Sequence, residues 1–173
     1  MRFSKTAAFL LAVTATVVAG ADQQPSTKSP APRHELAALP GVRLWFTDTG
    51  GNGEPVVLLH ANTGTSESWE PQIDALGKAG YRVIAFDRRG WGRSQADPAT
   101  GPQPGHTSGD LHALADFLSL RRFHLVGVAG GGFVALDYAA THPERLSSLI
   151  VAASTGSVSD KEVQDVIARL EIP

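Results

Sequence analysis

The chain has 173 residues, a formal net charge of −2 from 15 Lys+Arg against 17 Asp+Glu, 42% hydrophobic residues and no cysteine. This is an ordinary globular composition, and the lack of cysteine excludes disulfides, thiolate zinc sites, iron–sulfur clusters and a cysteine nucleophile. The near-balanced charge and the sequence pI of 6.3 provide no basic field for nucleic acid or for an anionic membrane surface, so neither is expected as a partner.

The first residues predict export. Arg2 and Lys5 precede an apolar run over residues 7–20, which the small residues 19–21 close. This run of 14 residues is shorter than the ~20 that a membrane span needs, so residues 1–21 are interpreted as a cleaved signal peptide. The mature protein is then expected to be secreted or periplasmic, without a membrane anchor.

A flexible linker is predicted over residues 22–38, whose first part is rich in Pro, Ser, Thr and Gln. A single domain is predicted over residues 39–156, because this stretch is too short to contain a second domain. Residues 157–173 carry an apolar helical face and are interpreted as the start of a helical cap segment, which would leave apolar surface exposed for self-association.

Within the domain, apolar strand patterns alternate with helical spacing. The first strand pattern is rich in β-branched and aromatic residues, is followed by dense turn residues and is interpreted as part of an early hairpin. A stretch with seven Gly or Pro at 87–106 is predicted to be a long loop, and Thr107 with Asp110 is predicted to cap the helix that follows. The predicted strands are 42–47, 56–59, 81–86, 124–128 and 146–153, and the predicted helices begin near Trp69, Thr107 and Phe133.

This alternation predicts an α/β fold with a mostly parallel sheet and helices on both faces. In such a fold ligands lie beyond the carboxyl ends of the strands. Two segments there are rich in small residues: residues 59–64 follow a buried strand, and residues 127–132 join a strand to a helix.

At these segments the chain resembles the α/β-hydrolase family. That family has a His-Gly-x-x-G type stretch after one strand, an Asp-x-Arg-Gly-x-Gly-x-Ser stretch after the next, and a Gly-x-nucleophile-x-Gly-Gly elbow after the third. Here the first stretch is His60-Ala61-Asn62-Thr63-Gly64, the second is Asp87-Arg88-Arg89-Gly90-Trp91-Gly92-Arg93-Ser94, and the third is Gly127-Val128-Ala129-Gly130-Gly131-Gly132. The resemblance covers roughly residues 42–154 and implies a truncated α/β-hydrolase fold.

The elbow places a nucleophile on a sharp turn between a strand and a helix, so its neighbours must be small, which accounts for Gly127, Gly131 and Gly132. The resemblance implies that the backbone N–H groups of Asn62 and Gly130 form the oxyanion site. Removing one such donor typically costs ~3–4 kcal/mol of barrier stabilisation.

The chain departs from the family pattern where chemistry is concerned. The nucleophile position holds Ala129, whose methyl group cannot attack a carbonyl. Ala61 stands where the family has Gly, which is expected to crowd the oxyanion loop slightly. The last histidine is His142, so the sequence shows neither the general base nor the carboxylate that family members carry downstream of the elbow.

The other polar residues of these motifs are predicted to be structural. His60 is expected to bond the loop backbone, and Asp87, Arg89 and Ser94 are expected to tie down their loop. Trp69 and Trp91 fit either a substrate pocket or a core cover. The histidines lack the H-x-x-x-H or H-E-x-x-H spacing of a metal site, and the glycines lack a nucleotide-binding pattern, so neither a metal nor a cofactor is expected.

Three functions stay open. The first is the N-terminal part of a secreted hydrolase for small esters or related acyl or carbon–halogen substrates, inactive as the chain stands. The second is a non-catalytic hydrolase-fold protein that binds a small molecule. The third is an enzyme without a covalent nucleophile, in which Asn62 and Gly130 polarise a carbonyl and water or a cofactor completes the reaction. It needs a base that the sequence does not show.

Overall fold

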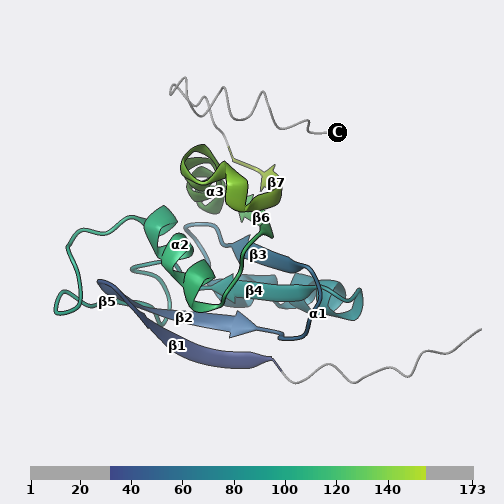
Figure 1. Ribbon diagram of the computed structural model, residues 1–173, viewed down its shortest axis with the longest axis horizontal. Helices are drawn as coiled ribbons and strands as arrows, with labels where there is room; N and C mark the ends of the chain where they lie inside the picture. Colours follow the sequence, from purple (N-terminus) through teal and green to yellow (C-terminus); the bar gives the residue numbers. More distant parts are fainter. Residues whose placement is uncertain (1–31, 155–173) are drawn as a thin grey trace, which may run out of the picture.

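The computed structural model of the protein describes residues 32–154 (Figure 1). The predicted signal peptide, most of the linker and the cap segment lie outside these residues. The strands are β1 (Arg33–Leu39), β2 (Val42–Asp48), β3 (Pro55–Leu59), β4 (Arg82–Phe86), β5 (Gln95–Ala96), β6 (Phe123–Val128) and β7 (Leu146–Ala152). The helices are η1 (Ser66–Trp69), α1 (Glu70–Lys78), α2 (Thr107–Phe117), α3 (Gly130–Thr141) and η2 (Pro143–Arg145).

One sheet contains all seven strands, in the order β1-β2-β4-β3-β6-β7, with the short β5 paired to β2. β4, β3, β6 and β7 are parallel to one another, and β1 and β2 are antiparallel additions at the β4 side. Figure 1 shows β1 and β7 at opposite ends of this sheet. The predicted mostly parallel α/β sheet is confirmed.

The linker prediction is wrong at its carboxyl end. Residues 33–38 belong to β1, which pairs along its whole length with β2, from Arg33 opposite Asp48 to Leu39 opposite Val42. The turn between the two strands contains Gly41 at φ +77, a conformation that glycine adopts without steric cost. The turn of the hairpin therefore lies between β1 and β2, and the turn-rich residues after β2 connect β2 to β3 instead.

Helices cover both faces of the sheet. Successive residues of β3 face opposite sides and therefore belong to two different cores. Val57 and Leu59 belong to the larger core, which α2 and α3 cover with residues such as Leu114 and Tyr138. Val56 and Leu58 belong to a smaller core, which Trp69, Ile73 and Leu76 of η1 and α1 cover. The continuous apolar run of β3 is thus buried on both sides, as predicted.

The predicted cap of α2 is also wrong. Thr107 is the first residue of the helix rather than its cap, and no side chain caps this end. The reason is that the Asp110 carboxylate is engaged elsewhere: Arg89 Nη2 and Nε lie 2.6 and 2.9 Å from its two oxygens.

Candidate active site at the carboxyl edge of the sheet

Three loops meet at one edge of the sheet, namely residues 60–65 after β3, residues 87–94 after β4 and the junction of β6 with α3. They meet because β4, β3 and β6 are adjacent and parallel, so their carboxyl ends lie at the same edge. The three motifs of the sequence are therefore brought together.

The junction of β6 and α3 is a strained elbow. Ala129, between the strand and the first helical residue, has φ 47° and ψ −114°, a conformation that L-residues rarely adopt. A β-carbon added to Gly127 would lie 2.5 Å from the Gly131 oxygen, and one added to Gly131 would lie 2.4 Å from the Leu59 oxygen. One added to Gly132 would lie 2.7 Å from the β-carbon of Ser154, so these glycines are sterically required.

Gly130 and Asn62, the two expected oxyanion donors, lie against each other. Gly130 begins α3, where a helix supplies no acceptor for the first backbone N–H groups. A β-carbon on Gly130 would lie 2.0 Å from Asn62 Oδ1, so the Asn62 side chain contacts the helix terminus. The Trp91 indole N–H donates to the backbone oxygen of Asn62 at 2.8 Å and fixes that loop.

His60 is a structural residue of this loop. Its ring is fully buried, and Nδ1 donates to the Ala61 oxygen at 2.7 Å while Nε2 accepts the backbone N–H of Arg88 at 3.0 Å. Burial lowers the pKa of His60, and the Arg88 charge acts in the same direction. With both nitrogens engaged and the neutral ring favoured, His60 is not placed to act as a general base.

Ala61 and Gly64 stand at the two ends of a tight turn. The backbone N–H of Gly64 donates to the Ala61 oxygen at 3.2 Å, and a β-carbon on Gly64 would lie 2.4 Å from Ser68 Oγ. Ala61 is not among the described residues with positive φ, so its backbone needs no glycine.

The second motif is held by its own polar residues. Asp87 is 1% exposed, and its Oδ1 accepts the backbone N–H and the hydroxyl of Ser66 at 2.8 and 2.7 Å. Its Oδ2 accepts the backbone N–H of Arg93 at 2.8 Å, and Ser94 Oγ donates to its backbone oxygen at 2.6 Å. Together with the pair of Arg89 and Asp110, these bonds confirm the structural roles predicted for Asp87, Arg89 and Ser94.

The sequence pattern assigns no definite role to Trp91 or Arg88. The Arg88 guanidinium lies over the Trp91 ring, 4.6 Å from its centroid, and Arg88 Nη2 donates to Asn62 Oδ1 at 2.7 Å. Trp91 is thus part of the site, whereas Trp69 packs on the smaller core. The pattern Asp87-Arg88-Arg89 does not reveal which arginine is paired with a carboxylate, and only the fold distinguishes them.

The last histidine of the chain, His142, is too distant to serve as a base for position 129. His142 follows the last residue of α3, and a helix of 12 residues places it ~18 Å from the elbow. Its ring stacks on that of His112, with the ring centroids 4.1 Å apart. Burial lowers the pKa of His142, and the charge of His112 lowers it further.

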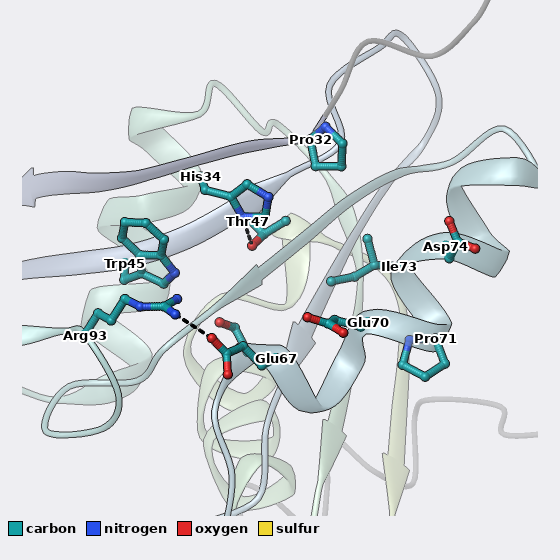
Figure 2. Close-up of a pocket in the computed structure, with 11 residues that line it drawn as sticks. Pro32, His34, Trp45, Thr47, Glu67, Glu70, Pro71, Ile73, Asp74 and Arg93 are labelled. Atoms are coloured by element: carbon teal, nitrogen blue, oxygen red, sulfur yellow. Dashed lines mark hydrogen bonds and ion pairs between the residues drawn. The ribbon is translucent and has the colours of Figure 1, made fainter.

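A separate cavity of about 700 Å³ lies away from the elbow. Figure 2 shows it between His34, Trp45 and Thr47 of the hairpin and the acidic side chains Glu67, Glu70 and Asp74 of η1 and α1. Arg93 joins the two sides, because its Nη2 lies 2.5 Å from Glu67 Oε1 and its guanidinium lies over the Trp45 ring. None of the elbow residues lines this cavity.

Within residues 32–154, no group of three or more His, Asp or Glu side chains is arranged to hold a metal ion. None of the helices in that range has the length and apolar content required to cross a membrane.

Comparison with known proteins points to one family. The family model described as "alpha/beta hydrolase fold" matches residues 54–171. A 2-hydroxy-6-oxononadienedioate/2-hydroxy-6-oxononatrienedioate hydrolase of Paraburkholderia phymatum is 36% identical over 122 residues, which are 68% of this chain and 42% of that protein. The protein of the same name from Escherichia coli O81 is 34% identical over the same shares.

Solved structures agree with this. Epoxide hydrolase A from Mycobacterium thermoresistibile matches with a TM-score of 0.62 and 30% identity, over 70% of this chain and 39% of that one. A variant of Vigna radiata epoxide hydrolase matches with the same TM-score and 28% identity, over 69% and 38%. The chain thus spans about two fifths of the length of the proteins it matches.

Proposed function

Because this chain belongs to the α/β-hydrolase fold family, we propose that it is the N-terminal part of an exported hydrolase for small esters or related acyl or carbon–halogen compounds. As the chain stands, its elbow site binds such a compound without forming a covalent intermediate. Small molecules are the expected ligands, since the relatives are named as hydrolases of small compounds.

The observation that carries the proposal is the backbone of Ala129. The residue keeps the strained φ of 47° and ψ of −114° although its side chain has no nucleophilic atom. An oxygen at this position would face a carbonyl carbon while the N–H groups of Gly130 and Asn62 met the developing oxyanion. A methyl group has no lone pair, so the carbonyl compound is held but not attacked.

A second candidate, a non-catalytic binding protein of the same fold, is favoured by the engaged nitrogens of His60. With Nδ1 on the Ala61 oxygen and Nε2 on the Arg88 N–H, the one buried imidazole beside the site offers no proton acceptor to an attacking water. The two candidates differ in whether a general base from a longer product reaches position 129. They agree that this chain by itself gives no turnover.

The test compares the unchanged chain with Ala129→Ser, each treated with a fluorophosphonate probe. We expect no labelling of the unchanged chain and slow labelling at residue 129 of the variant, because oxyanion donors alone retain part of the catalytic effect. Peptide mass spectrometry locates the modified residue, and circular dichroism checks the fold.

Ala153→Ser is the matched control. Ala153 also has a positive φ, 49°, but it follows β7, and the described residue after it, Ser154, is not helical. The Ala129→Ser chain should label at least about tenfold faster, as expected for a helix N-terminus with preorganised donors. Equal rates for the two variants, or labelling of the unchanged chain, would contradict the proposal.

Export is a separate part of the proposal, supported by the charged and apolar residues that precede Asp22. Amino-terminal sequencing of the protein isolated from its source, from the medium or the periplasm, should begin at Asp22. An amino terminus at Met1, or recovery from the cytosol alone, would exclude it.

A further inference from the structure

Arg88 is a buried cation without an anionic partner among the described residues. The residue is 4% exposed, and the hydrogen bond to Asn62 Oδ1 is the one that its side chain makes there. Its Nε is sealed from solvent and has no hydrogen-bond partner within residues 32–154. The semi-buried arginines differ: Arg82 pairs with Asp48, Arg89 pairs with Asp110, and Arg145 pairs with Asp116.

Such an arrangement is energetically unfavourable unless something compensates the charge. A buried charge is normally paired with an opposite charge, because leaving water is costly for an ion. Trp91 and the Asn62 amide compensate only in part, since one offers a π face and the other a neutral oxygen. Burial lowers the pKa of Arg88, as expected where no carboxylate stands beside it.

The position of Arg88 shows what is missing. Asn62 Oδ1 accepts the guanidinium and also occupies the space that a β-carbon on Gly130 would need, so Asn62 links Arg88 to the first residue of α3. A helix N-terminus and a guanidinium both favour an anion, and here they converge. Asn62 is itself exposed, so a ligand from solvent reaches the guanidinium by taking the place of the Asn62 side chain.

We infer that the elbow site takes a small molecule that carries a carboxylate, with Arg88 as the counter-ion of that group. This inference rests on the proposed function, because it concerns the same site and specifies its substrate class. A carboxylate matches the planar fork of one guanidinium. A phosphate, with its higher charge, would need further cations beside this one guanidinium.

The test measures the binding of benzoate, benzamide and inorganic phosphate to the full chain. Benzoate and benzamide have nearly the same shape and differ in charge. The readout is the indole N–H signals in nitrogen-15 NMR, since the chain has only three tryptophans and the Trp91 indole bonds the Asn62 oxygen. A Trp91→Phe chain assigns the signal.

We expect benzoate to shift the Trp91 signal more than the other two and to bind at least about tenfold more tightly than benzamide, as hydrogen bonds to a charged group allow. Arg88→Met should abolish this preference. Arg93→Met is the matched control and should retain it, because Arg93 also lies over a tryptophan ring but is paired with Glu67.

Three results would overturn the inference: equal binding or no binding of benzoate and benzamide, tighter binding of phosphate than of benzoate, or a benzoate preference that survives in Arg88→Met. If Arg88→Met does not fold, the ligand comparison on the unchanged chain and on Arg88→Lys decides. Labelling of Ala129→Ser by the fluorophosphonate is independent of these titrations. The elbow proposal therefore stands if the probe labels that variant while the carboxylate preference fails.

Discussion

Ala129 holds a backbone conformation that normally serves a nucleophile. A residue in such a region costs about 1–3 kcal/mol, which the surrounding contacts must offset. Gly127, Gly131 and Gly132 leave the elbow no room to relax, since any β-carbon there would meet backbone or side-chain atoms. The strain is thus imposed by the packing of α3 on β3, β6 and β7 and persists without a reactive side chain.

This strain predicts that Ala129→Gly stabilises the chain. Glycine removes the steric penalty of a positive φ but adds roughly 0.5–1 kcal/mol of unfolded-state entropy, so the free energy of unfolding should rise by about 1 kcal/mol. Urea denaturation measures the change. Ala113→Gly within α2 is the control and should lower the free energy of unfolding by about 1 kcal/mol, as in any helix interior. A loss of stability in both variants would refute the strain argument.

At the scale of single elements, sequence patterns identify what local burial determines. β3 and β4 are evident because their apolar runs are continuous, β6 and β7 are evident because they are mostly apolar, and the end of α1 is marked by Gly80 at φ +94. The elbow is marked by small residues at a strand end, whereas the oxyanion roles of Asn62 and Gly130 are what the resemblance to the family implies. In these places local sequence and fold agree.

The misread elements depend on distant partners. β1 contains Ala37 and Ala38 and follows a proline-rich stretch, so its strand character comes from pairing with β2 rather than from its own residues. The α2 cap fails because Arg89, on a loop far along the chain, takes the Asp110 carboxylate. The unpaired charge of Arg88 is likewise visible only in three dimensions, because adjacent arginines with the same sequence context have opposite surroundings.

At the scale of the whole molecule, the sheet has two unequal ends. β7 pairs on one side only within the described residues, and its Ile150 and Val151 are 55% and 36% exposed. An open strand edge with apolar side chains favours pairing with another chain. The self-association expected from the sequence stays a prediction, and Ile150 on this edge is the most exposed large apolar side chain within residues 32–154.

We expect the chain to associate at micromolar concentrations and Ile150→Lys to reduce the associated fraction severalfold, because it removes the exposed apolar side chain that favours association. Sedimentation velocity measures it. Ser147→Lys adds the same charge to the same strand at an exposed polar position and should leave association nearly unchanged. If the unchanged chain sediments as a monomer at all concentrations, this prediction is contradicted.

The strand order also determines how the molecule is assembled as it is synthesised. β1 and β2 are neighbours along the chain and can pair as soon as both have emerged, but β3 joins neither of them. Phe86 of β4 pairs with Phe46 of β2 on one side and with Leu59 of β3 on the other. Until residues 82–86 are available, the growing polypeptide therefore holds a hairpin and an unpaired apolar strand. That interval is when a nascent chain most needs protection from neighbouring chains.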